Sequence, residues 1–216
     1  MNDTSHDTSH DTSPDTADVP GDVSGRPDPR PGFARTATQL GETIRRVGDD
    51  DLARLTSCDG WDVQTLLAHI VGVANRVAAL GRGSIETGEL PVPDRVARAE
   101  WVPMWIGAAA DALDVWADDD LLTTMVSPPF GTMPGAVALG IYTTELTVHH
   151  WDLATAIGAP VEWDDRLIVG ALAGMMVALP ADGRGDGIPF SSVVDVAPDA
   201  APIDRLVAYT GRDPRT

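Results

Sequence analysis

The residues of this chain best suited to chemistry stand in the segment 145–154. Glu145 and His149 are four residues apart, so on a helix they lie one above the other on a single face. The neighbouring residues are mostly apolar, which predicts that this face points into a core. A carboxylate and an imidazole are costly to bury unless they are paired, and a divalent metal ion is a common partner. The spacing therefore predicts two ligands of a metal site.

A third candidate ligand lies in another apolar segment. His69 shares a helical stripe with Leu66 and Val73, so its imidazole also points where a core is expected. Three nitrogen and oxygen ligands leave the fourth position of a tetrahedral ion open, as in reactive zinc sites rather than structural ones. We therefore predict a divalent metal, zinc by its donor set, on His69, Glu145 and His149. The alternative is that these are ordinary hydrogen-bonded core residues.

Three further residues bear on this site. Asp152 follows His149 by three positions, and we expect it to accept the imidazole N–H and fix the tautomer. His150 points about 100° away from His149 on a helix, which predicts a place at the rim. Whether His150 or Asp152 joins the metal ligands is left open. Cys58 precedes His69 by 11 residues, too far for an obvious fourth ligand, and we expect an ordinary thiol rather than a nucleophile.

Helices are expected to position these residues. Helical periodicity predicts them over residues 33–47, 62–80, 95–117, 134–157, 164–179 and 201–209. Asp62 is a predicted N-cap, Pro134 is expected in the first turn of its helix, and Gly158 is expected to end that helix. Because no run of strands appears, we predict an all-α bundle, in which side chains from facing helices can form a metal site.

The composition divides the chain into three parts. Residues 1–31 are rich in Asp, Ser and Thr with few large apolar residues, which predicts a disordered acidic tail. Residues 32–180 are expected to form the metal-binding bundle. Residues 181–216 are expected to form a C-terminal extension with a short helix. No catalytic acid or base stands out from the sequence.

Charge and cysteine content narrow the possible partners. With 33 acidic residues against 15 basic ones, the net charge is −18, so nucleic acid and anionic membrane surfaces are poor partners. All 15 basic residues are Arg, as expected of a GC-rich genome such as an actinobacterial one. The single Cys and the lack of an apolar N-terminal segment predict a cytoplasmic protein.

Two motifs together resemble a known family. They are Trp61-Asp62-Val63 followed by Leu66-Leu67-Ala68-His69, and Glu145-Leu146-x-Val148-His149-x-Trp151-Asp152-Leu153-Ala154. This combination is similar to the metal-binding domain of the mycothiol-dependent maleylpyruvate isomerase family, within the DinB/YfiT-like superfamily of four-helix bundles. The segment from Pro202 to Pro214 further resembles an uncharacterised actinobacterial branch of metal-binding proteins. In the family, the residues matching His69, Glu145 and His149 hold a divalent metal, usually zinc.

The resemblance also implies a function. Superfamily members are transferases and isomerases that use low-molecular-weight thiols, so a mycothiol-type thiol and a small electrophile are the expected partners. Whether the chain also forms a homodimer is left open. The isomerase has a separate C-terminal domain that contributes to catalysis, but only 36 residues follow Pro180 here. The resemblance therefore carries over the metal site and not the isomerase activity. The competing interpretation is a non-catalytic or regulatory protein in which the metal only braces the bundle.

Overall fold

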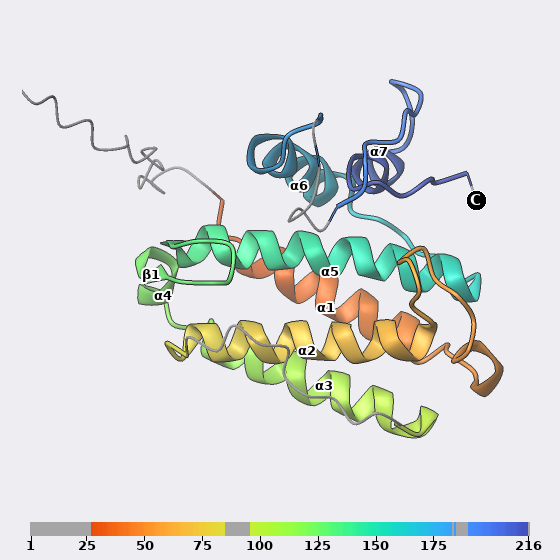
Figure 1. Ribbon diagram of the computed structural model, residues 1–216. Coiled ribbons are helices and arrows are strands. Elements are labelled where there is room, and N and C mark those ends of the chain that lie inside the picture. Colours follow the sequence, from red (N-terminus) through yellow and green to blue (C-terminus); the bar gives the residue numbers. More distant parts are fainter. Residues whose placement is uncertain (1–26, 85–95, 183, 185–189, 216) are drawn as a thin grey trace, which may run out of the picture.

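Four long helices form a bundle in the computed structural model (Figure 1). The structure describes residues 27–84, 96–182, 184 and 190–215. The helices are α1 (Arg30–Ile44), α2 (Val63–Gly81), α3 (Arg98–Val115) and α5 (Gly135–Ile157). Helix α2 packs on α3 and α5, and α1 packs on the same two helices from the other side. The all-α prediction is thus confirmed. The predicted tail falls almost entirely outside the described residues.

The helix ends follow the expected local chemistry. The Asp62 carboxylate accepts the N–H of Thr65 at 2.8 Å and caps the start of α2. Gly158 ends α5 with a φ of 66°, in the left-handed region that glycine adopts without steric cost. These two residues set the lengths of the two helices that carry the candidate ligands.

The prediction for Pro134 was wrong by one position. Pro134 directly precedes α5 instead of standing in its first turn, and it belongs to a short strand. Strands β1 (Met125–Val126) and β2 (Met133–Pro134) pair antiparallel after the short helix α4 (Asp120–Thr123). A Cβ atom on Gly135 would lie 2.0 Å from the Leu121 carbonyl oxygen, so this close approach requires glycine.

Tryptophan side chains fill the bundle core. Trp101, Trp105 and Trp116 are at most 2% exposed. The indole N–H of Trp105 donates to the Ala37 carbonyl at 3.1 Å and that of Trp116 to the Val77 carbonyl at 2.8 Å. These bonds tie α3 to α1 and the segment after α3 to α2. Trp101 and Trp105 thus serve the packing of the bundle.

A second layer covers α5 on its far side. Helices α6 (Asp165–Ala178) and α7 (Pro202–Tyr209) pack on each other and on α5, opposite α2 and α3 (Figure 1). A separate apolar cluster joins them to Val148 and Trp151 of α5. Helix α5 is therefore buried on several sides, which matches its nearly continuous apolar sequence.

Helix α2 also has the length and hydropathy of a membrane span. Its mean hydropathy is 1.3 over an 18-residue window, and 61% of that window is buried within the protein. Because α2 packs between α3 and α5 and carries His69, its apolar character is accounted for by the core.

Candidate metal centre

Helices α2 and α5 bring the three predicted ligands together. His69 Nε2 lies 3.2 Å from Glu145 Oε1, and the centroids of the His69 and His149 rings are 4.7 Å apart. One candidate ligand atom from each residue lies within 4.8 Å of the others. The inward faces of two facing helices thus form one compact cluster, as expected for a metal site in a bundle.

The cluster is largely shielded from solvent but keeps some access. The side chains of His69, Glu145 and His149 are 15%, 26% and 12% exposed. Burial raises the pKa of Glu145, but the His69 hydrogen bond and the nearby charges of His149, His69 and Arg76 outweigh it and keep that pKa below its ordinary value. Glu145 is therefore an anion at neutral pH.

Asp152 occupies the position predicted for it. Its Oδ2 lies 3.0 Å from His149 Nδ1, and the carboxylate is fully buried. Burial raises the pKa of Asp152, but hydrogen bonds from His149 and Arg212 outweigh that effect and lower it to about 2. Because an ionised carboxylate only accepts hydrogen bonds, His149 must carry its proton on Nδ1, which leaves the Nε2 lone pair to face a metal.

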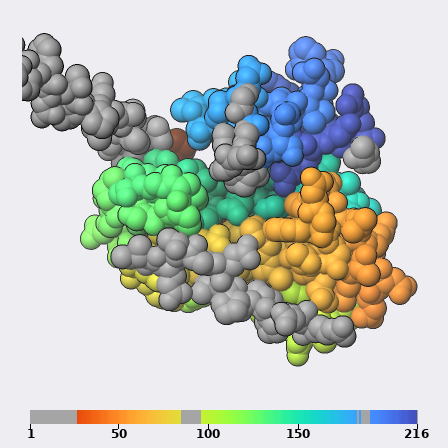
Figure 2. Space-filling model, viewed as in Figure 1, coloured from red at the N-terminus to blue at the C-terminus, as the bar shows by residue number. Residues whose placement is uncertain are grey.

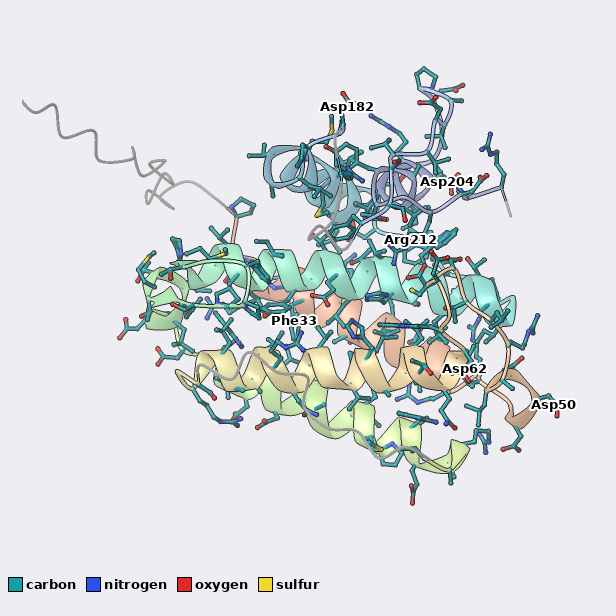
Figure 3. All side chains as sticks on the ribbon, viewed as in Figure 1. Phe33, Asp50, Asp62, Asp182, Asp204 and Arg212 are labelled. Carbon is teal, nitrogen blue, oxygen red and sulfur yellow. The ribbon has the colours of Figure 1, made fainter. Side chains whose placement is uncertain are left out.

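Arg212 is a residue of this site that sequence reasoning did not single out. Its Nε lies 3.1 Å from Asp152 Oδ1 and its Nη2 2.9 Å from Asp152 Oδ2, a two-point ion pair with only 12% of the guanidinium side chain exposed. It follows α7 and projects between that layer and α5 (Figure 3). The only signal in the sequence was the resemblance of the segment ending at Pro214 to a family branch.

Cys58 lies closer to the site than its separation in sequence suggested. Its Sγ lies 3.8 Å from His149 Nδ1 and 3.3 Å from Asp152 Oδ2, to which the thiol donates, so it borders the site instead of standing apart. The chain between α1 and α2, which includes the 3-10 turn η1 (Asp49–Asp51), folds back through a bridge between Leu55 and Asp62. This segment (orange) meets the C-terminal extension (blue) in Figure 2. The 11-residue separation between Cys58 and His69 therefore does not indicate how far Cys58 lies from the site.

The prediction for His150 was also wrong. Its side chain points away from the cluster, but it is only 1% exposed and does not lie at a rim. Its Nε2 is 2.7 Å from Thr43 Oγ1 of α1, and its ring lies 4.9 Å from that of Trp163. Burial lowers the pKa of His150 to about 4, so it is a neutral packing residue at neutral pH.

Trp61 forms an aromatic wall beside the two histidines of the cluster. Its ring centroid lies 4.9 Å from that of His69 and 6.2 Å from that of His149. Because Trp61 immediately precedes the N-cap of α2, the fold that caps this helix also places the indole. The indole thus flanks both imidazoles of the cluster.

A second group of potential ligands shares His149. Cys58, His149 and Asp152 also have ligand atoms within 4.8 Å of one another. Arg212 already neutralises Asp152, however, and burial together with the Asp152 charge raises the pKa of Cys58 to about 12. A metal there would have to displace the guanidinium and remove a tightly held thiol proton. The group of His69, Glu145 and His149 is the better donor set.

Comparisons with known proteins identify the fold and the family. The fold is an all-α DinB-like bundle. Residues 33–154 match the family model of the mycothiol maleylpyruvate isomerase N-terminal domain, and the chain belongs to that family. The match covers α1 through most of α5 and includes all three candidate ligands.

Two sets of relatives extend the comparison. Uncharacterized proteins from two strains of Mycobacterium tuberculosis are each 31% identical over 189 residues, which is 87% of this chain and 100% of each relative. The crystal structure of a variant of mycothiol-dependent maleylpyruvate isomerase aligns with a TM-score of 0.50 at 18% identity over 67% of this chain. The alignment spans 66% of that isomerase chain, and at this identity it supports the fold alone.

Proposed function

We propose that this chain is a metal-dependent enzyme that uses a low-molecular-weight thiol of the mycothiol type to act on a small electrophile, as a transferase or isomerase. The observation that carries the proposal is the convergence of His69, Glu145 and His149 from two helices. The family supports the thiol, because its model is named for a mycothiol-dependent isomerase. Since the chain spans only part of the solved isomerase, the proposal names the class of reaction and not that substrate.

The donor set fits a zinc ion. Two imidazoles and a carboxylate are typical ligands of catalytic zinc, and three protein ligands leave one position for a small molecule. A bound zinc ion would supply a Lewis acid that lowers the pKa of a thiol or water. The residues around it have their own roles: Asp152 holds the proton of His149 on Nδ1, Arg212 keeps Asp152 ionised, and Trp61 flanks the imidazoles.

The competing function is a metal that only braces the bundle, with no reaction. Cys58 is the residue that would favour it, since a thiolate is a good structural zinc ligand and this thiol lies close to His149. The thiol, however, approaches Nδ1, whereas Nε2 is the nitrogen left for the metal. The two ring nitrogens point to different sides of the imidazole, so the geometry favours an open fourth position over ligation by Cys58.

Metal analysis followed by cobalt substitution tests the proposal. The purified protein should hold about one zinc per chain, and a double variant with His69→Ala and His149→Ala should hold none. A small thiol added to the cobalt form should produce a sulfur-to-cobalt charge-transfer band, and Cys58→Ala should behave like the wild type. Stoichiometric metal in the double variant contradicts the site. A band present without added thiol and lost in Cys58→Ala supports the brace instead.

A further inference from the structure

A second pair of polar side chains lies on the same two helices as the candidate metal centre. Arg76 follows His69 by seven residues on α2, and Tyr142 precedes Glu145 by three residues on α5. Both spacings keep the side chains on the faces that carry the cluster, because seven residues are about two helical turns. Arg76 and Tyr142 therefore lie beside the cluster, toward the C-terminal end of α2.

One atom of each side chain in this pair has no well-formed hydrogen bond among the described residues. Tyr142 is 1% exposed, and within the described ranges neither its hydroxyl oxygen nor Arg76 Nε has a hydrogen-bond partner of good geometry. The two groups are neighbours, because Arg76 acts on the Tyr142 hydroxyl through its charge and through a side-chain interaction that falls short of good hydrogen-bond geometry. Buried polar groups without partners cost free energy and are often reserved for a ligand.

The pair lines a small cleft with both polar and apolar walls. Arg76, Tyr142, Ser84 and Ser127 are its polar lining residues, and the Ser127 hydroxyl is already bonded to Thr132 at 2.9 Å. The cleft holds about 10 Å³, roughly the space of one water-sized oxygen. Guanidinium and hydroxyl groups together suit an acceptor with negative charge, and the volume fits a single carboxylate oxygen better than a ring or chain.

Charge favours the same ligand. Arg76 carries a positive charge at a half-buried position in a chain of net charge −18. A guanidinium at such a position favours an anionic ligand.

We propose that Arg76 and Tyr142 form an anion subsite that holds a carboxylate of the small-molecule substrate beside His69, Glu145 and His149. This inference rests on the proposed function, because it assigns the substrate class of that same site. A carboxylate held here is anchored away from the metal position, so the rest of the molecule is directed toward the cluster. Anchoring of this kind supplies orientation, a large part of enzymatic rate enhancement.

Calorimetric titration at constant ionic strength tests the subsite. The probes are succinate and its neutral diamide, and the proteins are zinc-loaded wild type, Arg76→Gln, Tyr142→Phe and Arg82→Gln. Arg82 is the matched control, because it lies just after α2 and pairs with Asp111 at an exposed position. Succinate should bind the wild type more tightly than the diamide. Arg76→Gln should weaken succinate binding by roughly tenfold or more, whereas Arg82→Gln should bind like the wild type.

Two further readouts keep the outcomes distinct. Circular dichroism and zinc content show whether each variant keeps its fold and its metal. If Arg76→Gln does not fold, Arg76→Lys takes its place: it keeps the charge but loses the planar guanidinium, so it should bind succinate more weakly than the wild type while retaining part of the affinity. Equal succinate affinity in wild type and Arg76→Gln, equal affinity for succinate and the diamide, or no succinate binding overturns the subsite. Arg76-dependent succinate binding in a protein that takes up no zinc supports the subsite and contradicts the proposed function.

Discussion

His149 connects the two halves of the candidate site. Its Nδ1 is held by Asp152, which is itself paired with Arg212, and the same imidazole belongs to the cluster with His69 and Glu145. The carboxylate thus acts through the imidazole, by fixing its tautomer and its orientation. Cys58 shares Asp152 as a hydrogen-bond acceptor, so its reactivity reports directly on the state of this carboxylate.

At the residue scale, we predict that the Cys58 thiol of the folded, metal-free protein reacts slowly with iodoacetamide at pH 8. The thiolate is the nucleophile, and burial with the Asp152 charge raises the pKa of Cys58 to about 12. Asp152→Asn removes that charge and leaves the Arg212 guanidinium beside the thiol, so alkylation should become faster. Mass spectrometry over time measures both rates, with urea-unfolded protein as the reference. Folded wild type reacting as fast as unfolded protein would contradict this prediction.

A second prediction at this scale concerns metal affinity. Replacing Asp152 with Asn keeps the size of the side chain but weakens its hold on His149. Loss of such a supporting carboxylate lowers metal affinity by roughly 10- to 100-fold. Competition with a chromogenic zinc chelator measures the effect, and Cys58→Ala serves as a control that leaves Asp152 and Arg212 in place. Unchanged zinc affinity in Asp152→Asn would show that Asp152 does not act through His149.

At the element scale, the C-terminal layer completes the site from behind α5. Helices α6 and α7 bury Ile168, Leu206 and Val207 against Val148 and Trp151, and this packing brings Arg212 to Asp152. Gly211 has a φ of 93°, a left-handed conformation that turns the chain just before Arg212. The extension is thus a structural part of the candidate centre, although it follows the region matched by the family model.

We therefore predict that Arg212→Ala destabilises the protein markedly. It leaves a fully buried carboxylate without its cation, and breaking such a pair costs about 3–5 kcal/mol. Arg215→Ala is the matched control, because Arg215 makes an exposed pair with its near neighbour Asp213 and should change stability little. Urea unfolding of the three proteins measures the difference. Equal stability of Arg212→Ala and wild type would contradict the structural role of the ion pair.

At the scale of the whole molecule, helix α5 lies between the bundle and the C-terminal layer. It is largely apolar, and three of its ionisable side chains are paired with other elements: Glu145 with His69, Asp152 with Arg212, and His150 with Thr43. Buried titratable groups make global stability depend on pH. His150 is the group expected to change the free energy of unfolding between about pH 6.5 and pH 4, because burial alone shifts its pKa.

We predict that the metal-free protein loses stability as the pH falls from about 6.5 to about 4. In this window the unfolded chain protonates His150, whereas burial keeps the pKa of the folded imidazole at about 4. The unfolded state binds more protons, so the free energy of unfolding decreases with falling pH, by a few kcal/mol for this group. In His150→Gln the decrease should be smaller by that amount. Parallel pH profiles of the two proteins, measured by urea unfolding with chelator present, would contradict this assignment.

Acid acts on Asp152 at lower pH. The pKa of this carboxylate is about 2 in the folded protein, below its ordinary value, so the stability that it contributes is present above about pH 4 and is lost as the pH falls toward 2. The two windows hardly overlap. The His150→Gln comparison between pH 4 and 6.5 therefore isolates the histidine.

The sequence by itself determined the helices and the three candidate ligands. Periodicity, the Asp62 cap and the glycine at position 158 are local signals, since each depends on residues within a few positions along the chain. His69, Glu145 and His149 were also recognisable, because each places a polar group on an otherwise apolar helical face. Their convergence then followed from the bundle expected for such helices.

Only the tertiary structure decided what surrounds the ligands. Cys58 reaches His149 through a folded-back loop, and Arg212 reaches Asp152 from 60 residues away. His150 is buried because α1 and the C-terminal layer cover the face opposite the cluster, a face that sequence reasoning assigned to the rim. Such contacts depend on how helices and loops pack, and no local periodicity records which residues meet across them.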